Sequence, residues 1–168
     1  MVLAEQLGYH GVWVTEHHFR SFGGMTPNPQ LLLASLAART QRIRLGTAIS
    51  IVPLHHPLRI AEDLAMVDNI SGGRLDAGLG RGMPHTEYDV YGADWECSQE
   101  HLEEAVEVIR RAWSTPDFRW DGKHYHYRQP ITVLPPPVQQ PHPPIWITAN
   151  WDESHFRWVA RNGFHLMT

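Results

Sequence analysis

The chain has 168 residues, a formal net charge of −4 and a hydrophobic share of 42%. This length and apolar content suffice for one domain with a buried core, and the charge offers no basic surface for nucleic acid. No apolar run is long enough to span a bilayer, so we expect no membrane partner. The single cysteine, Cys97, excludes a disulfide framework and is typical of a reducing compartment, which predicts a cytoplasmic protein.

Helix-like and strand-like segments alternate along the first two thirds of the chain. Residues 2–8 are typical of the end of a helix, and residues 11–15 form an apolar strand that runs into Glu16, His17 and His18. Apolar periodicity and the placement of Pro and Gly then predict five further elements. In order, these are a helix at 29–39, a strand at 43–52, a helix at 57–70, a strand at 74–79 and a helix at 98–113.

Residues 116–144 interrupt this alternation. Asp121 and Gly122 stand between two alternating segments, which predicts a β-hairpin with its turn at this dipeptide. The proline-rich run at 135–144 favours an extended backbone. After it, the sequence predicts a strand at 145–149, a helix at 153–161 and a strand from 164 to 167.

Strands that alternate with helices through short connections predict an α/β fold with a parallel sheet and right-handed crossovers. A closed eight-stranded (β/α) barrel needs about 250 residues. This chain offers about five parallel strands, begins inside a helix and ends inside a strand. We therefore expect a partial TIM barrel, forming one domain over residues 1–168, with 116–144 as a hairpin and proline-rich excursion outside the barrel repeat.

Chemically useful groups follow three of the predicted strands: Glu16-His17-His18, Gly80-Arg81-Gly82 and Ala149-Asn150. In a parallel barrel these positions lie on one rim, where active sites form. His17 could act as a general base near neutral pH, or it could be a structural histidine at the start of a loop. The glycines beside Arg81 would let the backbone approach an anion, or Arg81 could simply face solvent.

Further histidines lie in predicted loops, at positions 55, 56, 85, 124, 126 and 142. A zinc site requires a definite ligand spacing, such as two histidines one helical turn apart with an acid between them, and the sequence has none. We therefore expect these histidines to be solvated and predict no metal site. A metal-dependent hydrolase on a similar barrel is the least favoured of three functional hypotheses.

Six short motifs resemble the luciferase-like monooxygenases, the family of bacterial luciferase and many flavin-dependent oxidoreductases. They are Glu-His-His-Phe at 16–19, Leu-Gly-Thr-Ala at 45–48, Pro-Leu-His-His-Pro at 53–57, Ala-Glu-Asp at 61–63, Ser-Gly-Gly-Arg-Leu at 71–75 and Gly-Arg-Gly at 80–82. Each motif is short, but their joint order and spacing are specific, and the resemblance covers nearly the whole chain.

The resemblance implies a barrel that binds reduced FMN, or in some branches a deazaflavin, on the rim described above. By this resemblance, His17 matches a catalytic base and Glu16 a flavin-site carboxylate. The remaining implied cofactor contacts are a non-prolyl cis peptide beneath the ring at Ala48 and Ile49, a phosphate ligand at Arg81, a neighbouring contact at Met83, and a second phosphate-binding turn at Ala149, Asn150 and Trp151.

Two positions depart from the pattern of the resembled family. Gln99 stands where relatives commonly have an arginine, which removes a cation from the phosphate pocket, and Trp151 replaces a small hydroxyl residue. The first hypothesis is nonetheless a monooxygenase that uses reduced flavin and O2 on a small organic substrate. It implies a separate flavin reductase and a homodimer formed through the helices at 29–39 and 57–70. The alternative is a shortened, non-catalytic flavin-binding or partner protein of the same family.

Overall fold

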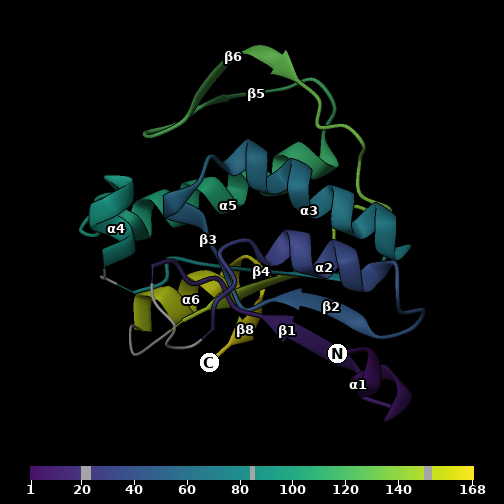
Figure 1. Cartoon of the computed structure of the whole chain (residues 1–168). Coiled ribbons are helices and arrows are strands. Elements are labelled where there is room, and N and C mark those ends of the chain that lie inside the picture. The colour runs from purple at the N-terminus through teal and green to yellow at the C-terminus, as the bar shows by residue number, and fades with distance from the viewer. Residues whose placement is uncertain (20–23, 84–85, 150–152) are drawn as a thin grey trace.

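The computed structural model describes residues 1–19, 24–83, 86–149 and 153–168. Figure 1 shows helices α2, α3 and α5 together on one side of the main sheet, with the hairpin β5–β6 beyond them. The elements are, in chain order, α1 (Val2–Gln6), β1 (Gly11–Val14), α2 (Pro29–Ala37), β2 (Arg44–Thr47), β3 (Ser50–Ile51), the 3-10 helix η1 (Val52–Leu54), α3 (Pro57–Ser71), β4 (Leu75–Gly80), α4 (Thr86–Tyr91), α5 (Ser98–Ser114), β5 (Phe118–Asp121), β6 (His126–Ile131), β7 (Ile145–Thr148), α6 (Glu153–Arg161) and β8 (His165–Met167).

The main sheet is parallel throughout, as the alternation of strands and helices predicts. Its strand order is β1-β2-β4-β7-β8, and β3 pairs with β4 beside this path. In the register, Val12 lies opposite Leu45, and Ala77 lies opposite Ile145. Because every strand runs the same way, all the carboxyl ends meet at one edge of the sheet.

The core lies between this sheet and helices α2, α3 and α5. Leu33, Leu64 and Ile109 from the helices and Leu79 and Ile147 from the strands are completely buried. Each such side chain contributes about 1.5–3 kcal/mol of transfer free energy. The apolar stripe predicted for the helix at 98–113 is the buried face of α5, which confirms that prediction.

The strand predicted at 43–52 is wrong as a single element. The backbone turns after Thr47 through a cis peptide bond between Ala48 and Ile49, and directly after this bond β3 pairs with the end of β4. The residue pattern of 43–52 carries no sign of this break, because the segment as a whole suits a buried strand. Helix α4 was likewise absent from the sequence prediction, since six residues are too few to show an apolar stripe.

The excursion contains the predicted hairpin, but its turn is not at Asp121-Gly122. Asp121 pairs with His126, so residues 122–125 form the loop, and the Gly122 N–H donates to the carbonyl oxygen of Tyr125. The two strands form a sheet of their own, separate from the main sheet.

One carboxylate on α5 fastens this hairpin to the helix layer. Glu104 Oε1 accepts hydrogen bonds from Trp120 Nε1 at 2.9 Å and from the Tyr125 N–H at 3.0 Å. Its Oε2 accepts from the N–H groups of Lys123 at 3.1 Å and His124 at 2.9 Å. Glu104 therefore satisfies the backbone donors of the hairpin loop directly.

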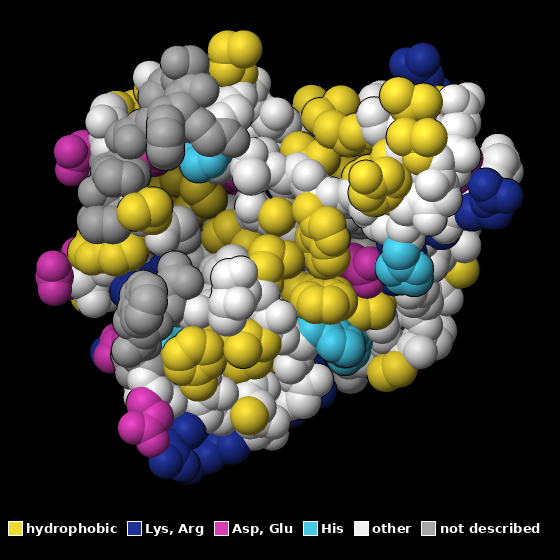
Figure 2. Space-filling model, turned by 90° about the horizontal axis from the view of Figure 1, so that it is seen from below, with side chains coloured by type: hydrophobic (Ala, Val, Ile, Leu, Met, Phe, Trp, Pro, Cys, Tyr) yellow, Lys and Arg dark blue, Asp and Glu magenta, His cyan; other side chains and the backbone are white. Residues whose placement is uncertain are grey.

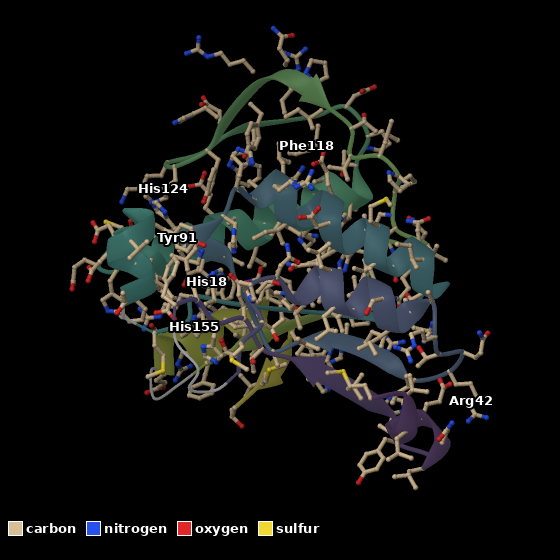
Figure 3. The ribbon with its side chains drawn as sticks, viewed as in Figure 1. His18, Arg42, Tyr91, Phe118, His124 and His155 are labelled. Carbon is tan, nitrogen blue, oxygen red and sulfur yellow. The ribbon has the colours of Figure 1, made fainter. Side chains whose placement is uncertain are left out.

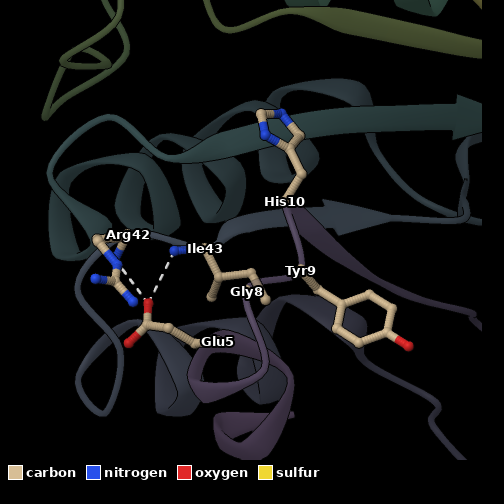
Figure 4. Close-up of a pocket in the computed structure, with 6 residues that line it drawn as sticks. All are labelled: Glu5, Gly8, Tyr9, His10, Arg42 and Ile43. Carbon is tan, nitrogen blue, oxygen red and sulfur yellow. Dashed lines mark hydrogen bonds between the residues drawn. The ribbon is translucent and has the colours of Figure 1, made fainter.

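The amino-terminal edge of the sheet is held by a second carboxylate. Glu5 Oε2 accepts from the N–H groups of Arg42 at 2.7 Å and Ile43 at 2.9 Å (Figure 4). It also accepts from the Gln41 N–H at 3.0 Å. The hydrogen bonds from Ile43 and Arg42 lower the pKa of Glu5 despite a small opposing effect of burial. Glu5, Arg42 and Ile43 line a pocket of about 350 Å³ together with residues 8–10.

An arginine completes this amino-terminal edge. Arg74, just before β4, donates from Nη1 to Thr40 Oγ1 and the Ile43 carbonyl, and from Nη2 to the carbonyl oxygens of Ala37 and Thr40. Its Nε donates to the carbonyl oxygen of Ser71 at 2.7 Å. One guanidinium thus joins the end of α2, the end of α3 and the start of β2.

The face of the sheet that α2, α3 and α5 leave uncovered carries aromatic side chains. The rings of Trp13 and Trp146 meet edge to face at 5.2 Å, and Trp146 stacks on His165. Figure 2, seen from below, shows apolar side chains gathered in a hollow on this side of the molecule. Within the described residues, none of the helices has the length and apolar content required to cross a bilayer.

Candidate functional site

The carboxyl ends of the parallel strands bring the predicted site segments to one edge of the sheet. Residues 15–18 follow β1, residues 48 and 49 follow β2, Arg81 follows β4 and Ala149 follows β7. Figure 3 shows His18 and His155 toward this end of the molecule and Arg42 at the opposite end. Asn150 and Trp151, predicted at the second phosphate turn, lie outside the described residues.

Glu16 is the centre of the hydrogen-bond network at this edge. Its side chain is 1% exposed, and its Oε1 lies 2.8 Å from His18 Nε2 and 2.6 Å from His55 Nε2. Its Oε2 accepts from the Ile51 N–H at 3.0 Å. The carboxylate thereby connects β1 to β3, immediately after the cis peptide bond, and supports that backbone from inside the protein.

This network changes the proton affinity of its members. Burial opposes the ionised form of Glu16, but hydrogen bonds from His55, His18 and Ile51 outweigh it, so the pKa of Glu16 is lowered. The hydrogen bond to Glu16 raises the pKa of His55, although burial acts in the opposite direction. The pair therefore favours a carboxylate beside an imidazolium in mildly acidic solution.

His55 shows where the sequence prediction of solvated loop histidines is wrong. The residue lies in the loop after η1, as predicted, but its ring is directed at a buried carboxylate that is 39 positions earlier in the chain. His124 departs from the same prediction, since its side chain is only 15% exposed and its ring lies 3.9 Å from that of His101. Sequence spacing cannot reveal either contact, because both depend on which elements are neighbours in the fold.

His17 and His18 differ although they are adjacent. His18 is buried, and its Nδ1 lies 3.1 Å from the Tyr91 hydroxyl on α4. The His17 backbone N–H donates to the carbonyl oxygen of Thr26 at 3.1 Å, and its half-buried imidazole makes no hydrogen bond to another described side chain. Of the two rings, His17 is the one whose nitrogens have no hydrogen-bond partner among the described side chains.

The Ala48–Ile49 peptide bond is cis, at the position that the resemblance indicates. The Ala48 N–H donates to the Val14 carbonyl at 2.7 Å, which ties the turn to β1. A Cβ at Gly80 would lie 2.4 Å from Ile49 Cδ1 and 2.3 Å from Thr148 Oγ1. Any larger residue at position 80 would therefore require the side chains of Ile49 and Thr148 to move.

Arg81 presents a cation at the same edge. Its guanidinium lies over the Trp95 ring at 4.4 Å, and it pairs with no carboxylate among the described residues. The Tyr88 hydroxyl donates to the Arg81 carbonyl, and burial raises the pKa of Tyr88 to about 12, which keeps this donor protonated. Met83 is 62% exposed beyond Gly82, whose positive φ of 70° suits glycine.

The position without the expected arginine has a defined role. Gln99 Nε2 donates to Glu103 Oε1 at 2.8 Å and lies 2.5 Å from His155 Nδ1. His155 Nε2 donates to the Thr148 carbonyl at 3.1 Å, so Nδ1 is the accepting nitrogen. Ala149, which follows Thr148, is buried. The sequence prediction missed His155, which lies within a helical segment and has no motif around it.

Comparison with known proteins connects this edge to a family. The family model described as luciferase-like monooxygenase matches residues 1–168. The chain is 38% identical over 166 residues to the flavin-dependent trigonelline monooxygenase, oxygenase component, of Acinetobacter baylyi, covering 98% of this chain and 45% of that relative. It is 30% identical over 165 residues to an alkanal monooxygenase alpha chain of Photorhabdus luminescens, again covering 98% and 45%.

A solved structure supports the same relationship. The crystal structure of monooxygenase RslO1 from Streptomyces bottropensis superposes with a TM-score of 0.95 at 39% identity, covering 99% of this chain and 50% of that one. The chain thus spans about half the length of the relatives it matches. This likeness confirms the predicted α/β fold and partial barrel, and the chain belongs to the luciferase-like monooxygenase family.

Proposed function

We propose that this chain provides the flavin-binding part of a monooxygenase that uses reduced FMN and O2 on a small organic substrate. The observation that carries the proposal is the combination of a whole-chain family match with four strand ends that meet at one edge and bear the matched residues. Flavin supplies the redox chemistry when it is bound, and the protein must hold it, orient it and exclude water.

The residues at this edge fit a flavin phosphate and ring. Arg81 is a cation without a described carboxylate partner, and a guanidinium suits a phosphate because it can donate two parallel hydrogen bonds. The backbone of residues 48 and 49 would support the ring, and Glu16 would hold that backbone through Ile51 rather than contact the flavin. The other proposed contacts, on the strength of the family resemblance, are Met83, Ala149, Asn150 and Trp151.

His17 is the proposed proton-transfer group. Its imidazole has no described side-chain partner that would occupy either nitrogen, and it lies just after β1. A positioned base contributes about 10²–10⁴-fold to a rate. His17→Ala should therefore lower substrate oxygenation at least 100-fold while the dissociation constant of reduced FMN changes by less than about twofold.

The test combines anaerobic titration of reduced FMN with turnover under O2, using a separately supplied reductase. Arg81→Ala should weaken FMN binding about tenfold or more, since a charge-assisted hydrogen bond is lost. His10→Ala and Arg42→Ala are matched controls at the opposite edge of the sheet and should leave both measurements unchanged. Equal turnover in His17→Ala would remove that residue from the role.

The same experiment separates the alternative function. A chain that binds FMN with an affinity dependent on Arg81 but turns over no substrate would be a non-catalytic flavin-binding or partner protein. A reduced deazaflavin titrated in parallel decides the cofactor, and we propose that FMN binds more tightly. The Acinetobacter relative is named as an oxygenase component, which supports a separate reductase partner for this chain.

We further propose a homodimer formed through α2 and α3. These adjacent helices expose Leu31, Met66 and Ile70, which a partner copy would cover. Sedimentation velocity should show a dimer for the chain and a monomer for Met66→Glu. Met25→Glu, at an exposed loop position, should leave the dimer intact.

A further inference from the structure

We propose that Glu16, His18 and His55 form a binding site for a divalent transition-metal ion such as Zn²⁺. The proposal does not depend on flavin binding, because it concerns the interior of the network and not the open edge that carries His17 and Arg81. No sequence motif identifies these three residues as ligands, since Glu16 and His55 are 39 positions apart in the sequence.

The three donor atoms already lie close together. One oxygen of Glu16 and one nitrogen each of His18 and His55 fall within 4.8 Å of one another. Metal–ligand bonds of about 2.0–2.2 Å in a tetrahedron place neighbouring donors about 3.3 Å apart. The Nε2 atoms of His18 and His55 lie 2.8 Å and 2.6 Å from Glu16 Oε1 and no more than 4.8 Å from each other, so the three donors surround a common point that an ion could occupy after side-chain adjustment.

The donor set selects the class of ion. Two imidazole nitrogens and one carboxylate oxygen suit Zn²⁺, Co²⁺, Ni²⁺ or Fe²⁺, whereas Mg²⁺ and Ca²⁺ prefer oxygen ligands throughout. Three protein ligands leave a fourth position of the tetrahedron for water or another small ligand. Burial of Glu16 and His18 reduces competition from solvent for the same donors.

Groups behind the ligands are placed to hold them in the metal-binding form. When His18 Nε2 binds an ion, its ring proton resides on Nδ1, where the Tyr91 hydroxyl oxygen at 3.1 Å can accept it. Glu16 Oε2 keeps its hydrogen bond from the Ile51 N–H, which orients the carboxylate. Histidine ligands with such outer partners are the usual arrangement in metal sites.

An ion can reach the site from the His55 side. The His55 side chain is 33% exposed and lines a small pocket of about 50 Å³ together with Asn28, Gln30, Arg59 and Asp63. Arg59 carries the permanent positive charge among these residues, and its Nη2 pairs with Asp63 Oδ1 at 2.9 Å. The neighbouring Asp63 thus offsets the charge of Arg59 along the entry path.

Isothermal titration of the flavin-free, chelator-washed chain with Zn²⁺ alone tests the proposal. We expect one ion per chain, and no binding heat with Mg²⁺. Glu16→Gln and His55→Ala should each weaken Zn²⁺ binding by more than tenfold, and Tyr91→Phe by about tenfold. With Co²⁺ the chain should give the visible absorption of a four-coordinate site, and His55→Ala should lose that absorption.

His56→Ala is the matched control, because this neighbouring imidazole packs against Tyr125 and Tyr127 and not against Glu16. It should bind Zn²⁺ as the unaltered chain does. Since His55 is partly exposed, His55→Ala is expected to fold, and circular dichroism checks this. Undiminished Zn²⁺ affinity in folded His55→Ala, or no stoichiometric ion in the unaltered chain, would overturn the proposal.

Discussion

The two edges of the parallel sheet are both organised around a glutamate, but the partners of the two carboxylates differ. Glu5, at the amino-terminal edge, bonds to three consecutive backbone N–H groups, and the neighbouring Arg74 bonds mainly to backbone carbonyls. Glu16, at the carboxyl-terminal edge, bonds to one backbone N–H and to two imidazoles. Hydrogen bonds to backbone groups hold the chain in its fold. Imidazole partners can in addition bind and release protons or ions.

The largest expected effect belongs to the amino-terminal edge. Arg74→Ala should lower the free energy of unfolding by about 3 kcal/mol, because several carbonyl groups lose a charged donor at once. Urea denaturation measures this change. Arg39→Ala, an exposed position at the end of the same α2 region, should cost less than about 0.5 kcal/mol. FMN affinity per folded molecule should stay unchanged in Arg74→Ala, and a loss of binding there would erase the distinction between the two edges.

Glu16→Gln should lower the free energy of unfolding by about 2 kcal/mol near pH 6, since hydrogen bonds to a charged group are replaced by weaker ones. The effect should depend on pH in two directions. The lowered pKa of Glu16 adds stability that is present above its ordinary pKa and is lost as pH falls through the lowered value. The raised pKa of His55 adds stability that is present below its ordinary pKa and is lost as pH rises through the raised value.

Urea denaturation from acidic to alkaline pH measures the difference in free energy of unfolding between the unaltered chain and Glu16→Gln. This difference should be largest in mildly acidic solution and should become smaller at both lower and higher pH. His55→Ala is the companion variant. When Glu16→Gln is made in the His55→Ala background, the difference in free energy of unfolding should no longer narrow on the alkaline side. A difference in free energy of unfolding that stays constant with pH would mean that the charge of Glu16 makes no contribution to stability.

Glu5→Gln makes the same substitution at the other edge and should have a smaller effect, because this carboxylate is more accessible to water. The hydrogen bonds from Ile43 and Arg42 lower the pKa of Glu5, so its contribution is present above its ordinary pKa and is lost as pH falls through the lowered value. With no imidazole bonded to Glu5 among the described residues, its pH profile, measured by the same urea denaturation, should have an acidic limb only. An alkaline limb in this variant would contradict the contrast between the edges.

Tyr91→Phe should have the smallest effect on folding, about 0.5–1 kcal/mol, because it removes one hydrogen bond from the buried His18 ring. Thermal unfolding measures the change. The substituted ring keeps the aromatic packing that Tyr91 makes against Phe19. A loss well above this range would mean that the hydroxyl holds α4 in place and is not merely the outer partner of His18.

The sequence predicted what depends on local pattern. Alternating apolar segments implied the parallel sheet, and the stripe from Leu102 to Trp113 located α5 almost to the residue. The residue pattern did not reveal the break between β2 and β3, because residues 43–52 suit a buried strand throughout; only the family resemblance indicated a cis peptide bond there. The partnership of Glu16 with His55 could not be read either, since these residues meet only after β1 and β3 are assembled.

Adjacent imidazoles posed a different problem. The sequence could place His17 and His18 at a strand end, and the family resemblance selected His17. It could not show that His18 turns inward to Glu16 while His17 stays free of side-chain partners in the described structure, because that difference follows from the backbone path beyond Val14.

Glu104 has a practical consequence for changing the hairpin. Its carboxylate accepts hydrogen bonds from the backbone N–H groups of Lys123, His124 and Tyr125. Every amino acid except proline has such a donor. The exposed Lys123 can therefore be replaced by any residue except proline, whereas His124 also contacts His101 and Tyr125 also packs against the core. A foreign loop of equal length that keeps the contacts of His124 and Tyr125 could accordingly dock on α5 through the same carboxylate.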